Sequence, residues 1–206
     1  MRADALANKE KLRVAAAAAY GERGLTVPVK EIARRAGLSH GTLYNLFGTR
    51  EALIDDVIGD IAAQKLEAVG VTALELASPW EGFTYYVETL CGLMATDPVI
   101  SDVVRRAVPK ATRIAEICDR CHTMGSLVIN RAKNEGSLRA DFQETDVIFI
   151  FGAYASLARA LENTASGSWR RGIALILDGL RATAAQPLPV PELTRQQLFE
   201  VNSALG

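Results

Sequence analysis

Three residues in one short stretch have the types and spacing of a ligand-binding motif. The stretch Cys118–Asp–Arg–Cys121–His122 has the spacing through which c-type haem is attached covalently. Two thiols and an imidazole within about one helical turn also suit zinc, copper or a redox sensor, with Cys91 as a further ligand from another helix. Buried, inert thiols are the common alternative. The motif is therefore compatible with a metal or redox site and also with a purely structural role.

The surrounding sequence argues against covalent haem. Such attachment takes place in an export compartment, whereas residues 1–11 are polar and mixed in charge, with no apolar signal-peptide core behind them. No apolar run reaches the roughly 18 residues that a bilayer requires. An odd number of cysteines is not a disulfide framework. We therefore expect a cytoplasmic protein with no membrane partner and no cofactor.

A second set of residues with chemical potential lies in a short helical pattern near the N-terminus. Its outward positions are small or polar: Ser39, His40, Gly41, Thr42, Tyr44 and Asn45. Such a surface can enter the major groove of DNA, about 12 Å wide, and reach base edges and phosphates. Lys30 and Arg50 flank the stretch, and each is expected to neutralise a phosphate. A surface helix with scattered polar groups is the alternative for any one of these residues.

Charge is distributed unevenly along the chain, although the net charge is only −1. Residues 1–50 hold nine basic and four acidic side chains, whereas the remaining residues hold 14 basic and 20 acidic ones. A basic N-terminal part followed by an acidic remainder is the charge pattern expected if residues 1–50 contact phosphates. An ordinary solvated surface explains the charge alone equally well. The acidic balance of the whole chain argues against a structural nucleoid protein.

Helices are expected to position these groups. Residues 9–20 are Ala-rich, and an apolar stripe at helical spacing comprises Leu12, Ala16, Ala19 and Tyr20. Two short helices, about 28–35 and 39–47, follow and are joined by a turn at Gly37. A small core is expected beneath them from Ile32, Ala33, Leu38 and Leu43. Two short helices with a third packed across them form a helix-turn-helix unit.

The rest of the chain also has a helical pattern. A fourth helix is expected from residue 50, and breaker or capping residues separate longer helices at about 80–95, 98–106, 109–134, 144–164 and 168–184. No sheet is expected. After the proline-rich segment 187–191, Thr194 and Gln197 have the spacing of a capping box, which indicates a short terminal helix.

The predicted fold class is therefore all-α. A three-helix, DNA-binding helix-turn-helix domain occupies residues 1–50, with the fourth helix, about 50–70, as a connector. A helical-bundle domain for ligand binding and dimerisation is expected over residues 71–206.

Residues 12 to about 60 resemble the DNA-binding domain of the TetR family of bacterial regulators, most specifically over the stretch from Val29 to Leu53. The resemblance implies DNA contacts from Lys30, His40, Gly41, Thr42, Tyr44 and Arg50. Two positions depart from the family pattern. His40 stands where a basic or amide residue is usual, and Leu46 stands where a histidine or polar residue often contacts phosphate. The base preference is therefore expected to differ.

The second half resembles the regulatory domain of the same family more loosely, over residues 136–141 and 169–181. This resemblance implies a bundle that dimerises through its last two long helices and encloses a small-molecule cavity. Those helices are also apolar on nearly all sides, which favours burial at a homodimer interface over a monomeric core. Expected interface residues are Phe151, Tyr154, Leu157, Ile173, Ile176, Leu177 and Leu180.

A ligand pocket is expected where aromatic, Met and Cys residues recur at helical spacing. The candidates are Phe83, Tyr86, Leu90, Cys91, Met94, Cys121, His122 and Met124. Plain core packing is the alternative for such a stripe. Few charges fall among these residues, so the unidentified effector is expected to be mostly apolar.

The favoured function is a ligand-responsive repressor that binds a palindromic, double-stranded DNA operator as a dimer and is released by a small effector. A metal- or redox-sensing repressor that uses Cys118, Cys121 and His122 is the alternative. A helical-bundle enzyme is more remote, because the two histidines lie far apart and no phosphate-binding glycine loop is present. We therefore expect a protein that is not an enzyme.

Overall fold

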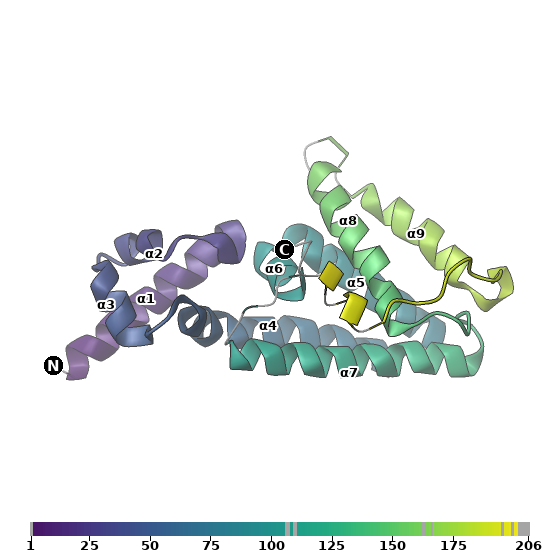
Figure 1. Ribbon diagram of the computed structural model, residues 1–206, viewed down its shortest axis with the longest axis horizontal. Helices are drawn as coiled ribbons and strands as arrows, with labels where there is room; N and C mark the ends of the chain where they lie inside the picture. Colours follow the sequence, from purple (N-terminus) through teal and green to yellow (C-terminus); the bar gives the residue numbers. More distant parts are fainter. Residues whose placement is uncertain are drawn as a thin grey trace. The chain divides into compact units, whose positions relative to one another are not determined.

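The computed structural model describes residues 2–105, 108, 111–161, 164–165, 167–194, 196–198 and 200–201. Its α-helices are α1 (Arg2–Arg23), α2 (Val29–Arg35), α3 (His40–Phe47), α4 (Arg50–Glu75), α5 (Pro79–Thr96), α6 (Pro98–Arg105), α7 (Thr112–Glu135), α8 (Val147–Leu161) and α9 (Trp169–Leu180) (Figure 1). Short 3-10 helices are η1 (Gly24–Thr26), η2 (Glu144–Asp146) and η3 (Ala182–Ala184). No strand occurs among these described residues, so the all-α fold class is confirmed.

Some helix ends differ from the sequence-based bounds. Helix α1 begins at Arg2 rather than near residue 9, because residues 2–8 contain helix formers and no breaker. The helix expected over 144–164 is divided into η2 and α8. The division follows from a capping box in which the Gln143 amide donates to the Asp146 carboxylate at 2.7 Å.

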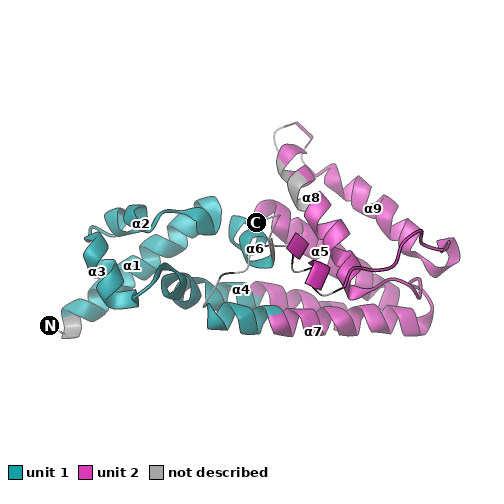
Figure 2. Ribbon diagram, in the orientation of Figure 1, with its two compact units in different colours: residues 1–64, 97–118 teal, residues 65–96, 119–206 magenta. Residues whose placement is uncertain are grey.

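The chain forms two compact units, which Figure 2 distinguishes by colour. Unit 1 comprises residues 1–64 and 97–118, and unit 2 comprises residues 65–96 and 119–206. Helix α6, which the sequence analysis assigned to the second domain, groups with unit 1 because it packs against α1 and η1. The compact units describe packing alone, and the expected domain limits at residues 50 and 71 remain a prediction.

Unit 1 has a small apolar core, and hydrogen bonds to carboxylates link the helices around it. The α1 stripe of Leu12, Ala16, Ala19 and Tyr20 is completely buried, as its spacing predicts. The Leu25 amide donates to the Asp102 carboxylate at 2.7 Å and thereby links η1 to α6. Asp55 of α4 accepts hydrogen bonds at 3.2 and 3.0 Å from the amides of Arg113 and Ile114 in the first turn of α7. This carboxylate therefore caps the N-terminus of α7 from a neighbouring helix.

Unit 2 packs α5 against α8 and α9. Gly82 permits the close approach of α5 to the end of α4, since an added Cβ would lie 2.4 Å from the Ala73 carbonyl oxygen. The Arg131 guanidinium donates to the carbonyls of Leu74 and Ala77 at 2.9 and 3.0 Å. Arg131 of α7 thus satisfies carbonyl groups at the C-terminal end of α4.

Residues 181–194, here called the C-terminal strap, follow α9. The Ala182 amide donates to the Ser137 carbonyl at 2.9 Å, and the Arg139 amide donates to the Leu180 carbonyl at 3.0 Å. The buried Arg139 side chain binds the Asp141 carboxylate and the Gln186 carbonyl. These contacts hold the first half of the strap against the loop after α7.

The strap ends at the capping box that the sequence predicts. The Gln197 amide donates to the Thr194 hydroxyl at 3.2 Å, and the Thr194 amide donates back to the Gln197 side-chain carbonyl at 2.9 Å. The described residues 196–198, 200 and 201 are helical, so the predicted terminal helix is confirmed over them. None of the described helices combines the length and the apolar character needed to cross a lipid bilayer.

Candidate nucleic-acid interface

The turn between α2 and α3 is fixed by backbone hydrogen bonds. Gly37 has φ of +69°, a left-handed conformation that favours glycine. Its amide donates to the Arg34 carbonyl at 3.1 Å, and the Leu38 amide donates to the Ala33 carbonyl at 2.9 Å. This pair of bonds is a Schellman motif, which ends α2 and redirects the chain into α3.

Helix α3 is capped at its start and anchored at its middle. The Ser39 hydroxyl accepts a 3.0 Å hydrogen bond from the Thr42 amide, and it lies 2.8 Å from the Thr42 hydroxyl. Leu43 is completely buried, whereas Leu38, also expected in this core, is only half-buried. Because an eight-residue helix is unstable alone, the cap and the Leu43 anchor must hold it.

Most of the predicted DNA-contacting residues on α2, at the start of α3 and along α3 are exposed, and this set of residues is here called the α3 face. Its members are Lys30, Ser39, His40, Gly41, Thr42, Tyr44 and Asn45, of which all but the half-buried Thr42 are exposed. The rings of His40 and Tyr44, one turn apart, meet edge to face with centroids 4.8 Å apart. The two aromatic side chains therefore lie next to each other on this face.

Gly41 differs from the turn glycines on either side of it. Gly37 and Gly48 have positive φ, whereas Gly41 lies in regular helix and its added Cβ would meet only the Ser39 hydroxyl oxygen, at 3.7 Å. That distance is an ordinary van der Waals contact. The fold therefore has room for a side chain at residue 41. Because glycine has no side chain, the backbone is exposed there.

Arg50 has a different environment from the other predicted DNA contacts. It is half-buried, and its guanidinium donates to the Leu25 carbonyl. Tyr20 beside it is buried, and this burial raises the pKa of its hydroxyl to about 12, which the positive charge of Arg50 opposes. Arg50 thus ties the start of α4 to η1, a structural role that the sequence did not indicate.

A network of ion pairs joins α1 and α2. The Arg35 guanidinium binds Glu22 through two nitrogens at 2.9 and 2.8 Å and also contacts Glu31 at 3.0 Å. Arg23 makes a further pair with Glu31. Hydrogen bonds from Arg35 and Arg23 lower the pKa values of Glu22 and Glu31, respectively. These arginines therefore serve to join the helices of unit 1.

The predicted ligand-pocket residues on α5 lie together in the core of unit 2. Phe83, Tyr86, Leu90, Cys91 and Met94 are all buried. The α7 candidates are more dispersed: Met124 packs against Gly70 of α4, and Tyr86 approaches Gly125. His122 lies outside this group, since its side chain is 57% exposed and Nε2 contacts the Glu144 carboxylate at 2.9 Å.

The cysteine motif does not assemble a metal site in the described part of the chain, where no group of three or more His, Cys, Asp or Glu residues has the required geometry. All three cysteines are thiols, and burial of Cys91 raises its pKa to about 12. Cys118 and Cys121 are half-buried on α7. Their neighbour His122 is engaged with Glu144 instead.

The predicted interface residues fall into two groups. Ile173 and Leu177 are buried within the chain's own core, whereas Phe151, Tyr154, Ile176 and Leu180 are half-buried and Leu157 is 44% exposed. Two large apolar residues on these helices that the sequence-based set omitted, Phe149 and Leu175, are 61% and 64% exposed. Their apolar type was visible in the sequence, but which side of each helix faces the core was not.

Two family models match the chain. Bacterial regulatory proteins of the tetR family match residues 12–57, and the C-terminal domain of SbtR-like transcriptional regulators matches residues 78–182. The first match contains the helix-turn-helix, and the second covers about half of the chain. No curated protein sequence matches significantly.

Solved structures with the same fold include several regulators. The ketosteroid transcriptional regulator KstR2 of Mycobacterium tuberculosis is 23% identical with a TM-score of 0.59, over 84% of this chain and 94% of its own. FadR from Bacillus subtilis, in complex with stearoyl-CoA, is 18% identical with a TM-score of 0.59, over 86% and 99%. RolR, in complex with resorcinol, is 20% identical with a TM-score of 0.58, over 92% and 99%. With the helix-turn-helix geometry and the two family models, these likenesses establish that the chain belongs to the TetR family of DNA-binding transcriptional regulators.

Proposed function

We propose that this regulator is a repressor that binds a palindromic operator as a homodimer and is released by a small, mostly apolar effector. The observation that carries the proposal is the α3 face, where exposed polar groups surround a helix anchored by the buried Leu43. A polar helix face held rigidly from behind is suited to the major groove.

Each residue of the α3 face has a role in this proposal. His40, Tyr44 and Asn45 offer groups for base edges or phosphate oxygens, and exposed Gly41 permits close approach of the backbone. Ser39 and Thr42 present hydroxyls that already bond to each other, so they position α3 as well as contact DNA. Lys30 neutralises a phosphate. Arg50 reaches phosphate after releasing or sharing its bond to the Leu25 carbonyl.

The exposed apolar side chains of α8 and α9 support the homodimer. Phe149, Leu157 and Leu175 leave a large part of their surface uncovered in the single chain. Pairing these helices with a second copy would bury that surface and gain hydrophobic free energy. Two-fold symmetry would then present two α3 faces to half-sites about one DNA turn apart.

The effector proposal rests on the apolar α5 residues of unit 2. Phe83, Leu90 and Met94 are buried on the same helix as the hydroxyl-bearing Tyr86 and the thiol-bearing Cys91, which are also buried. Structures with this fold hold an acyl-CoA in FadR and a small phenol in RolR. An effector that binds one arrangement of the dimer more tightly shifts its population away from the DNA-bound form.

Fluorescence anisotropy with DNA from upstream of the chain's own gene tests DNA binding. We expect specific, steeply salt-dependent affinity for a palindrome in that DNA. Lys30→Glu should abolish measurable specific binding, whereas the control Lys65→Glu in unit 2 should leave it unchanged. Circular dichroism must accompany Arg50→Glu, because this change also removes the contact with Leu25. Unchanged affinity when Lys30 and Arg50 are both reversed would refute the regulatory account.

A further inference from the structure

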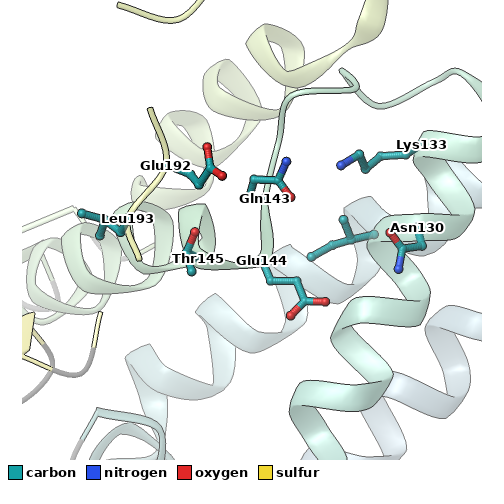
Figure 3. A pocket seen from close by; sticks show the side chains of 8 residues that line it. Asn130, Lys133, Gln143, Glu144, Thr145, Glu192 and Leu193 are labelled. Carbon is teal, nitrogen blue, oxygen red and sulfur yellow. The ribbon is translucent and has the colours of Figure 1, made fainter. Parts of the chain in front are cut away.

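A polar cavity of about 310 Å³ lies in unit 2 between α7, the segment that begins η2 and the C-terminal strap (Figure 3). It is lined by Ile129, Asn130, Lys133, Gln143, Glu144, Thr145, Glu192 and Leu193. These residues differ from the buried apolar set on α5 in both position and chemistry. The lining of the cavity therefore shares no residue with the apolar α5 set of the effector site proposed above.

The charges around this cavity have a specific arrangement. Lys133 and Asn130 project from α7 on one side, and Glu192 and Leu193 of the strap lie on the other (Figure 3). Glu144, the second carboxylate, lies at the base of the view. One cation and two carboxylates complement a ligand that carries one carboxylate and two cationic groups.

Hydrogen bonds hold several of these side chains in place. The Lys133 ammonium donates to the Phe142 carbonyl at 2.8 Å and retains further donors for a ligand. The Glu144 carboxylate is oriented by His122 at 2.9 Å and keeps acceptor capacity. The strap beside Glu192 is held by Arg139 on one side and the Thr194 capping box on the other. Lys133 and Glu144 are therefore positioned before any ligand arrives.

One polar atom at the cavity lacks a partner within the described part of the chain. The Thr145 hydroxyl oxygen is buried and makes no hydrogen bond. Such a group is costly unless it is satisfied. Because this oxygen is shielded from solvent, it supplies no contact to a ligand in the arrangement seen here.

We propose that this cavity binds a small dibasic amino acid. Its carboxylate contacts Lys133, and its two ammonium groups contact Glu144 and Glu192, with the amides of Asn130 and Gln143 as further partners. The volume lies near the lower end of the range for ligand pockets, roughly 300–1,000 Å³, which suits a molecule of this size. The proposal does not depend on the DNA-binding proposal, because binding is measured without DNA.

Isothermal titration calorimetry of the full chain with L-lysine tests this site. Two probes serve as controls, namely 1,5-diaminopentane, which lacks the carboxylate, and 6-aminohexanoate, which lacks the α-amine. Because a hydrogen bond to a charged group contributes about 1.5–3 kcal/mol, L-lysine should bind about tenfold or more tightly than either. No detectable L-lysine binding, or equal affinity for all three probes, would overturn the proposal.

Variants assign the contacts to particular residues. Glu192→Gln should weaken L-lysine and 6-aminohexanoate alike, about tenfold, because the side-chain ammonium that both carry is the group that reaches across from Lys133 to the strap. Lys133→Met should remove its advantage over 1,5-diaminopentane, while Lys133→Arg retains it and controls for the lost bond to Phe142. Glu75→Gln, an exposed carboxylate on α4, is the matched control and should leave affinity unchanged. Undiminished binding by both Glu192→Gln and Lys133→Met would place the ligand elsewhere and refute the site.

Discussion

The α3 face of unit 1 and the outer surface of α8 and α9 in unit 2 are both exposed, but opposite kinds of side chain cover them. On α3, polar groups point outward and the apolar Leu43 is completely buried. On α8 and α9, large apolar residues such as Phe149 and Leu175 remain exposed after the chain has packed its own core. The first arrangement is complete within one chain, whereas the second indicates a surface that association would cover.

This comparison predicts that α3 depends on its own anchor for stability. Leu43→Ala should lower the free energy of unfolding by about 2–5 kcal/mol, because it removes a completely buried side chain and leaves a cavity. The half-buried Leu46 on the same helix is a matched control, and Leu46→Ala should cost clearly less. Urea unfolding followed by circular dichroism measures both variants. Equal losses would show that α3 lacks a specific anchor.

The exposed surface of α8 and α9 should instead govern association. Leu175→Glu should raise the dimer dissociation constant by about 100-fold or more, because a charge would be desolvated at the proposed interface. Leu127→Glu on α7 replaces a similarly exposed leucine, at 52% against 64%, and should leave the dimer intact. Sedimentation velocity across a concentration series distinguishes the two. Loss of the dimer in both variants, or in neither, would contradict the interface proposal.

Within the α3 face, two residues should affect DNA binding differently. His40→Ala should change the ranking of operator variants, by about 1–3 kcal/mol at the affected base pair, because His40 is proposed to read a base. Lys30→Ala should weaken all operators alike and lower the salt slope by about one, because it is proposed to contact phosphate. Anisotropy titrations over a panel of operator variants measure both effects. If both variants lost affinity equally for all operators, His40 would not read a base differently from the phosphate contact proposed for Lys30.

Much of the fold was predictable because its signals are local. The Gly37 turn, the Ser39 cap and the Thr194 capping box each depend on residues within a few positions, and the structure contains all three. The Leu12 to Tyr20 stripe likewise follows helical spacing.

Long-range features were not predictable from spacing. The contact of Arg50 with Leu25 and the packing of α6 on α1 depend on approaches between distant segments, which no local pattern encodes. The same reason explains the candidate interface and pocket sets. Ile173 and Leu175 lie two residues apart on an apolar helix. Ile173 is buried and Leu175 is exposed, and only the packing of the helix decides which of them faces the core. The polar cavity of unit 2 is lined by residues of α7 and by residues about 60 positions later in the chain, so no local motif could predict it.

The smallest expected effects compare two glycines. Gly37→Ala should cost about 1–2 kcal/mol of stability, because φ of +69° strains any residue with a Cβ. Gly41→Ala should preserve or raise stability by up to about 1 kcal/mol, since it fits regular helix with an ordinary 3.7 Å contact. It should nevertheless weaken operator binding, because the added methyl group would occupy space proposed for DNA. Thermal unfolding and anisotropy on the same samples separate the effects. Undiminished operator affinity in Gly41→Ala would show that the backbone does not approach DNA closely there, and loss of stability would show that the glycine serves the fold instead.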